Sequence, residues 1–182
     1  RLMLNIMQRM SGIATMTNEA AELTRGTNAT VTDTRKTLPG LRALQKYAVT
    51  CGGGKNHRFN LSDAAMLKDN HIDAKGGITP AVKALSKKIG HTVKIEVETR
   101  TLDEVKEALA VGANVIMLDN MNCETMKQAV EMTAGRAKLE ASGNVTLDNI
   151  RQIAETGVDI ISLGALTHSV TAFDISMKWG KP

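Results

Sequence analysis

Residues 93–119 read V-K-I-E-V-E-T-R-T-L-D-E-V-K-E-A-L-A-V-G-A-N-V-I-M-L-D, and the order of apolar and turn residues in this segment indicates the fold class. Two short β-branched runs, at residues 93–97 and 114–118, lie on either side of a helical segment. Thr101 and Glu104 form a capping box at the start of that segment, which ends before Gly112. The stretch therefore predicts a strand, a helix and a second strand, which together are the repeating unit of a parallel sheet.

The same unit recurs through the second half of the chain. Further β-branched runs cover residues 137–139 and 159–162, and turn signals bracket helices at residues 122–135 and 146–157. A polar residue stands at the end of each of the four runs or directly after it, at intervals of 21, 21 and 22 residues: Glu98, Asp119, Glu140 and Ser162. This interval is the length of one strand, loop and helix, so the sequence predicts a β/α repeat.

The first half of the chain is less regular. Apolar residues recur at helical spacing from Leu2 to Arg25, which predicts one long N-terminal helix. Residues 29–31 and 65–67 are predicted to be strands, with a helix at residues 39–49 between them.

These elements predict an α/β fold with six parallel strands, and a seventh is possible at residues 173–177. No G-x-G-x-x-G motif follows the first strand, which favours a barrel over a doubly wound sheet. Since a full barrel has eight strands, we expect an incomplete or open β/α barrel, preceded by the long helix. We expect residues 1–182 to form a single domain.

The composition excludes several classes of function. Aromatic residues make up 2% of the chain, too few to stack the bases of single-stranded nucleic acid, and the formal charge of +4 is dispersed. No apolar stretch approaches the roughly 20 residues of a membrane span. Cys51 and Cys123 are not spaced as zinc ligands or as a disulfide framework. We therefore expect a cytoplasmic protein that binds neither nucleic acid nor membranes, and a small anionic substrate fits the composition better.

Cationic side chains follow the first two predicted strands. In barrels of this kind, function lies on the loops after the strands. Arg35 and Lys36 follow the first strand, Lys68 follows the second, and the run C-G-G-G-K-N-H-R at residues 51–58 places His57 and Arg58 beside three glycines. Lys68 directly follows a buried strand, where a cation needs an anionic partner.

A solvated surface position is the simpler interpretation of any lone Lys or Arg. We expect it for Arg42 and Lys46, on the exposed side of the predicted helix at residues 39–49.

Carboxylates and small turns follow the later strands. Glu98 and Asp119 follow neighbouring strands, an arrangement that suits a hard divalent cation such as Mg²⁺. The turn at residues 142–143 and Gly164 are predicted to hold phosphate through backbone amides. The residues alone therefore predict an enzyme that acts on a phosphorylated, strongly anionic substrate with Mg²⁺.

A series of longer motifs resembles one family. The motifs are T-R-K-T-L-P-G-L-R at 34–42, G-G-G-K-N-H-R-F-N-L-S-D-A-A-M-L-K-D-N-H at 52–71, E-V-E at 96–98, L-D-N at 118–120, L-E-A-S-G at 139–143 and S-L-G-A-L-T-H-S at 162–169. In this order they closely resemble the quinolinate phosphoribosyltransferases, transferases of NAD biosynthesis that decarboxylate quinolinate to nicotinate mononucleotide. The resemblance covers essentially the whole chain, and the first two motifs are long enough to be specific.

The resemblance implies a role for each matching residue. Those matching the surroundings of the two quinolinate carboxylates are Arg35, Lys36, His57, Arg58 and Lys68. Glu98 and Asp119 match the acids that bind Mg²⁺ and the ribose of phosphoribosyl pyrophosphate (PRPP). Those matching the phosphate loops are Ser142, Gly143, Gly164 and His168. Lys68, Glu98 and Asp119 are the residues that we expect to act in catalysis.

The resemblance also implies a homodimer or a higher homo-oligomer, and Arg1 matches an arginine that in the family reaches across a dimer interface into the partner's site. The family's N-terminal α/β sandwich domain is expected to be absent from this chain. One position departs from the family pattern, since Asn144 stands where the family commonly has glycine.

Three alternatives remain open from the sequence. One is a related type II phosphoribosyltransferase that acts on another heterocyclic acid. Another is a barrel fragment that folds but is catalytically incomplete. The third is an aldolase barrel that forms a Schiff base through Lys68.

Overall fold

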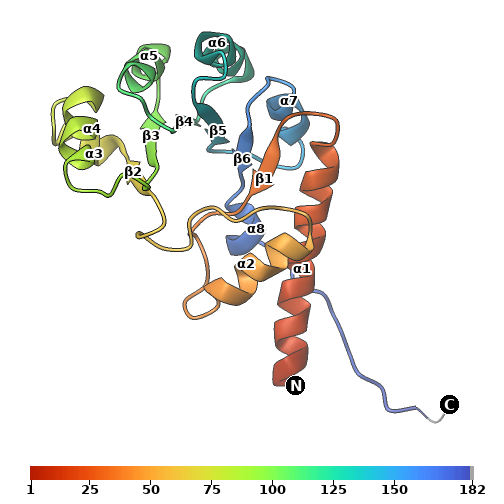
Figure 1. The fold of residues 1–182 in the computed structure, drawn as a ribbon. Helices are drawn as coiled ribbons and strands as arrows, with labels where there is room; N and C mark the ends of the chain where they lie inside the picture. The colour runs from red at the N-terminus through yellow and green to blue at the C-terminus, as the bar shows by residue number, and fades with distance from the viewer. Residues whose placement is uncertain (181–182) are drawn as a thin grey trace.

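The computed structural model describes residues 1–180, and its centre is one sheet of six parallel strands (Figure 1). In chain order the strands are β1 (Thr30–Thr32), β2 (Ala65–Leu67), β3 (Ile95–Thr99), β4 (Val115–Asp119), β5 (Lys138–Ser142) and β6 (Ile160–Ser162). Their order across the sheet is β1-β6-β5-β4-β3-β2, so β1 and β2 are edges that do not pair with each other. The prediction of an open β/α barrel is confirmed.

Helices cover the outer face of the sheet and its β1 end (Figure 1). The outer ones are α3 (Asp69–Asp73), α4 (Ile78–Ser86), α5 (Leu102–Ala110), α6 (Cys123–Thr133) and α7 (Ile150–Ala154). At the β1 end, α1 (Leu2–Leu23) packs against α2 (Arg42–Cys51) and α8 (Ala165–His168). The long N-terminal helix is confirmed, whereas α3 is too short to show a helical period in the sequence. No helix among residues 1–180 is long and apolar enough to cross a membrane.

The two central helices begin at side chains that cap their free amides. The Thr101 hydroxyl accepts a hydrogen bond from the Glu104 N–H at 3.2 Å before α5. Asn122 Oδ1 accepts one from the Thr125 N–H at 2.8 Å before α6. Both caps satisfy amides that have no partner inside the helix, so the β/α boundaries follow from local sequence.

The two faces of the sheet differ in polarity. Val97, Ile116 and Leu139 are almost fully buried in the core between sheet and helices. Their neighbours in sequence point the opposite way, because side chains alternate along a strand. The register pairs Glu98 with Met117 and Met117 with Glu140, so the two glutamates face the inner side of the sheet with Met117 between them.

Two details of the sequence prediction are wrong. The possible seventh strand at residues 173–177 does not form within the described chain. Instead, the Phe173 N–H donates to Gln8 O at 3.1 Å and Gln8 Nε2 donates to Ile175 O at 3.0 Å, which ties the segment to α1. The strands are also longer than predicted. Glu98 and Glu140 lie within β3 and β5 and do not follow them, because these strands extend to Thr99 and Ser142.

Candidate active site

A pocket of about 630 Å³ lies at the carboxyl ends of the strands, on the inner face of the sheet. This volume is typical of sites for small molecules. Most of the predicted site residues line it: Arg35, Lys36, His57, Arg58, Lys68, Glu98, Asp119, Ser142 and Gly143. The structure thus brings the predicted cations and carboxylates to one place.

Three predicted residues do not line this pocket. Gly164 lies beside its wall, since a Cβ built there would be 3.4 Å from Lys36 Cδ. His168 Nδ1 lies 2.5 Å from the hydroxyl oxygen of Ser169. Arg1 is exposed at the start of α1, at the end that projects away from the sheet (Figure 1).

The glycine run packs against α1 and turns the chain back toward the sheet. A Cβ on Gly52 would be 2.3 Å from Ala14 O, and Gly53 has a φ of +88°, which favours glycine. The Lys55 N–H then donates to Val31 O at 2.9 Å, so this segment lies along β1. This turn and alignment carry His57 into the pocket.

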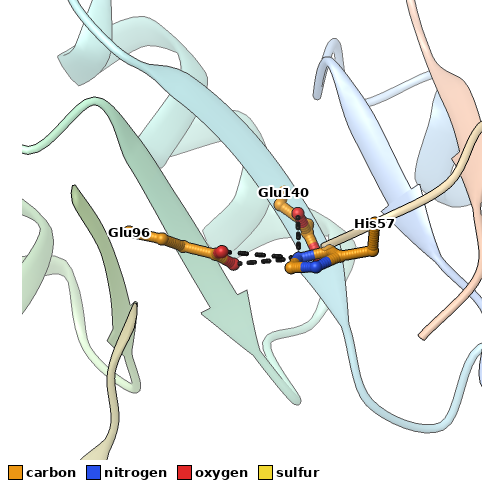
Figure 2. Close-up of side chains that lie close together, drawn as sticks. All are labelled: His57, Glu96 and Glu140. Atoms are coloured by element: carbon orange, nitrogen blue, oxygen red, sulfur yellow. Dashed lines mark hydrogen bonds and ion pairs between the residues drawn. The ribbon is translucent and has the colours of Figure 1, made fainter. Parts of the chain in front are cut away.

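The His57 ring contacts two buried glutamates (Figure 2). Its Nε2 lies 3.4 Å from Glu96 Oε2 and 3.4 Å from Glu140 Oε2. Glu96 and Glu140 are 4% and 2% exposed, and Glu140 Oε1 has no hydrogen-bond partner among the described residues. Two carboxylates with so little solvent need a hydrogen-bond donor, which the ring supplies.

The sequence prediction missed this role of the glutamates. Glu96 was not singled out, and Glu140 served only as a marker of the repeat. The signal that would have found them is the period of two along a strand. Each lies two residues before a predicted site residue, Glu98 or Ser142, and therefore faces the same side.

The cluster of His57, Glu96 and Glu140 retains a proton at neutral pH. Burial alone would lower the pKa of His57, but hydrogen bonds and charges from Glu140 and Glu96 outweigh burial and raise that pKa to about 10. Burial also raises the pKa of Glu96. The Arg58 backbone N–H donates to His57 Nδ1 at 2.8 Å, which opposes a second hydrogen on the ring. We therefore assign the retained proton jointly to the ring and the Glu96 carboxyl.

The same hydrogen bond decides how a metal ion could be held. The ligand atoms of His57, Glu96 and Glu140 lie within 4.8 Å of one another. Because Nδ1 accepts the Arg58 N–H, hydrogen is assigned to Nε2, which then has no lone pair for a metal. Glu98 and Asp119, in contrast, offer carboxylate oxygens to the open pocket, and such oxygens suit Mg²⁺.

Cations near the pocket differ in how they are held. Lys68 Nζ lies 3.5 Å from Glu98 Oε2, so its predicted anionic partner is present, although the Lys68 side chain is 51% exposed. Arg35 Nε is buried without an acceptor among residues 1–180. Among the residues that the structure describes, Arg58 Nη2 reaches only Met66 Sδ, a weak acceptor, at 3.0 Å, and its Nη1 reaches Ala64 O at 3.4 Å. The two guanidinium groups therefore have capacity to bind an anion.

The surface interpretation of Lys46 is wrong. Lys46 is 1% exposed, and its Nζ forms an ion pair with Asp33, which is fully buried. The reason is that α2 turns this side toward β1 and the glycine run. Arg42 is partly buried and donates to Phe59 O at 3.1 Å.

A chain of asparagines supports the turn at Ser142 and Gly143. Asn144 Nδ2 donates to Asn120 Oδ1 at 2.9 Å, and Asn120 Nδ2 donates to Asp119 Oδ2 at 3.0 Å. A Cβ on Gly143 would lie 2.3 Å from Asn120 Oδ1, and Gly143 has a φ of +91°. Asn144 itself has a φ of 50°, which asparagine tolerates.

The fold and the pocket together define a class of protein. Cations and carboxylates together line one pocket at the carboxyl ends of parallel barrel strands, where α/β barrels bind small molecules. The class is that of α/β barrel proteins with a site for a small, strongly anionic molecule.

Comparison with known proteins narrows the class to a family. Residues 13–178 match the family described as "Quinolinate phosphoribosyl transferase, C-terminal domain". The chain belongs to this family.

Named relatives agree with this assignment. The chain is 51% identical over 177 residues to the "Probable nicotinate-nucleotide pyrophosphorylase [carboxylating]" of Bacillus subtilis, covering 97% of this chain and 61% of the relative. It is 50% identical over 196 residues to the chloroplastic nicotinate-nucleotide pyrophosphorylase of Oryza sativa, covering 98% and 52%. The chain thus spans about half to three fifths of the length of these relatives.

Solved structures give the same result. The crystal structure of NadC from Streptococcus pyogenes superimposes with a TM-score of 0.95 at 46% identity, covering 98% of this chain and 63% of that one. The nicotinate-nucleotide pyrophosphorylase of Ehrlichia chaffeensis superimposes with a TM-score of 0.92 at 42% identity, covering 96% and 63%.

Proposed function

We propose that this chain carries the phosphoribosyl-transfer site of a quinolinate phosphoribosyltransferase. The reaction joins quinolinate to the phosphoribosyl group of PRPP and releases pyrophosphate and CO₂, giving nicotinate mononucleotide. The observation that carries the proposal is the pair of guanidinium groups, Arg35 and Arg58, that face the pocket with unused donors. Family membership and the names of the relatives support the substrate.

The cationic wall would bind the two carboxylates of quinolinate. Arginine binds a carboxylate through two parallel N–H donors, which fixes its plane as well as its position. With Arg35 and Arg58 on the carboxylates, and Lys36 and Lys68 adding positive charge, the pyridine nitrogen is oriented for attack. His57 would act mainly by holding the main chain at Arg58, because its Nδ1 accepts the Arg58 backbone N–H.

Glu98 and Asp119 would hold Mg²⁺ and the ribose hydroxyl groups of PRPP. Both carboxylates line the pocket, and oxygen ligands with open positions suit this ion. When bound, Mg²⁺ supplies positive charge that offsets the charge of the pyrophosphate. Ser142, Gly143, Gly164 and His168 are proposed to hold phosphate near the same end of the sheet.

The proposed chemistry follows from charge. Attack by the pyridine nitrogen at the ribose carbon forms an N–C bond and breaks the bond to pyrophosphate, which leaves with the bonding electrons. Lys68 stabilises that growing negative charge more in the transition state than in the ground state. The positively charged ring nitrogen then accepts the electrons of the C2–carboxylate bond as CO₂ leaves, and a proton from solvent replaces it.

Assembly and location are further parts of the proposal. We propose a homodimer in which Arg1 lies near the partner's site, since Arg1 does not reach the pocket of its own chain. A cytoplasmic location stays a prediction, because relatives from plants are named as chloroplastic or mitochondrial.

Turnover with quinolinate, PRPP and Mg²⁺ tests the proposal, measured as nicotinate mononucleotide formed and CO₂ released. We expect equal amounts of both products. Calorimetric binding of quinolinate without turnover would favour a catalytically incomplete barrel. Turnover with a different heterocyclic acid alone, or borohydride trapping of a carbonyl substrate on Lys68, would overturn the proposed substrate and reaction.

A further inference from the structure

A buried ion pair lies next to the pocket but does not line it. Lys46 on α2 and Asp33 after β1 are 1% and 0% exposed, and Lys46 Nζ contacts Asp33 Oδ1. Neither residue is among those that form the pocket wall. The proposed reaction therefore gives this pair no direct role.

The pair binds both backbone polar groups of one pocket residue. Lys46 Nζ donates to His57 O at 3.0 Å, and the His57 N–H donates to Asp33 Oδ1 at 2.9 Å. Among the described residues, this is how the main chain at His57 is tied to α2 and to the end of β1. The backbone pairing of Lys55 with β1 ends two residues before His57, so the contacts of the ion pair hold the His57 peptide groups themselves.

A contribution to folding stability does not by itself account for the buried ion pair of Lys46 and Asp33. Burial raises the pKa of Asp33 even though Lys46 and the His57 N–H act to lower it. Buried ion pairs of this kind can often be replaced by apolar residues without loss of stability. Apolar residues in place of Lys46 and Asp33 would lose the hydrogen bonds to His57 O and from the His57 N–H, and these bonds place His57.

We infer that Lys46 and Asp33 are positioning residues, which fix the His57 backbone so that its ring meets Glu96 and Glu140 and its Nδ1 holds Arg58. The chain of contacts runs from the ion pair to the His57 backbone, and from the ring to the Arg58 N–H. Figure 2 shows the His57 ring in this chain of contacts, with Glu96 and Glu140 directed at it. A displacement of about 1 Å in such a site can cost on the order of 100-fold in rate. The substrate part of this inference rests on the proposed function.

Two double variants separate positioning from stability. Asp33→Asn with Lys46→Met keeps an acceptor for the His57 N–H and removes the donor to His57 O. Asp33→Leu with Lys46→Met removes both contacts. A control, Asp103→Leu with Lys106→Met, removes an exposed ion pair on α5.

The first readout is quinolinate affinity by calorimetry, with the melting temperature measured beside it. We expect the dissociation constant to rise about threefold in the first variant and about tenfold or more in the second, as two lost contacts loosen the site. The control should stay within about 1.5-fold. If the second variant does not fold, the first decides the result. Unchanged affinity in every folded Asp33/Lys46 variant would overturn the inference.

The second readout needs no substrate. The ¹⁵N signals of the His57 ring, assigned with a His57→Asn variant, should shift in both double variants and not in the control. If the unmodified chain does not bind quinolinate, the proposed function fails, and the ring signals still test the positioning role. Unshifted His57 signals in folded variants would overturn it.

Discussion

The two halves of the sheet build the pocket in different ways. In the repeat from β3 to β6, strands carry Glu98, Asp119 and Ser142 directly to the pocket, and each is placed by its own strand. Between β1 and β2, the chain reaches the pocket through irregular loops that carry Arg35, His57 and Arg58.

Acidic and cationic side chains are thus placed by different means in this barrel. Residues of the repeat need only strand register, which is local and regular. Residues of the irregular half need contacts with distant residues, such as the Lys46–Asp33 pair and the packing of the glycine run on α1. Substitutions in the two halves should therefore have different consequences for function and stability.

The largest effect is expected where the halves meet, at Lys68 and Glu98. Lys68→Ala should lower turnover about 100-fold or more, since it removes charge that acts on the leaving group. The melting temperature should change little, because a half-exposed ion pair contributes less than about 1 kcal/mol. Steady-state kinetics and thermal melting test this, with Lys127→Ala on the exposed face of α6 as the control. Turnover within threefold of the unmodified chain would refute the role of Lys68.

Next in size is a pH-dependent effect of the glutamates that the repeat places under His57. The pKa of His57 is about 10 in the folded chain, against an ordinary value of 6.5. Between pH 6.5 and pH 10 the folded cluster therefore still holds a proton that the unfolded chain has already released. Its stabilising contribution is complete below pH 6.5 and is lost as the pH rises through 10.

Glu140→Gln should flatten this dependence, because it removes a carboxylate that raises the pKa of His57. Urea unfolding at pH 7 and pH 10 is the measurement, and the unmodified chain should lose about 2–4 kcal/mol more than the variant. His91→Gln, at an exposed histidine, should leave the dependence unchanged. Equal losses in the unmodified chain and Glu140→Gln would contradict the shared proton.

A smaller effect is expected at a turn of the repeat. Gly143→Ala places a methyl group 2.3 Å from Asn120 Oδ1 at a positive φ, so the Asn120 amide must move and its hydrogen bond to Asp119 is disturbed. We expect a loss of about 1–3 kcal/mol in unfolding free energy and about tenfold weaker PRPP binding. Gly112→Ala is the matched control, because it has a positive φ and nothing within 4 Å. Equal PRPP affinity in the two variants would show that the turn is not part of the phosphate site.

The smallest effect is expected at Asn144, where the chain departs from the family pattern. Asn144→Gly relieves a φ of 50° but loses the hydrogen bond to Asn120. These contributions oppose each other, so stability should change by less than about 0.5 kcal/mol. PRPP affinity, measured by calorimetry, should stay within twofold, and a tenfold change would give Asn144 a direct role.

The sequence predicted the repeat well because its signals are local. Alternating β-branched runs and capping residues such as Thr101 and Asn122 fix the strands and helices without distant contacts. The family motifs also predicted which residues gather in the pocket. Their individual roles stay predictions.

The irregular half was harder, because burial there depends on tertiary packing. Nothing near Lys46 in the sequence shows that its side of α2 faces Asp33 and the His57 backbone. Glu96 was missed for a different reason. Its strand reads as a buried run, and the alternation that places Glu96 on the same face as Glu98 is hidden within that run.

The most direct test is a crystal structure of this chain with quinolinate bound, grown without PRPP or Mg²⁺. We predict that the two carboxylates lie against the Arg35 and Arg58 guanidinium groups, with the ring over the inner face of the sheet. The His57 ring should remain between Glu96 and Glu140. Quinolinate bound away from Arg35 and Arg58, or an empty pocket at saturating quinolinate, would contradict the view that the irregular half supplies the dianion site.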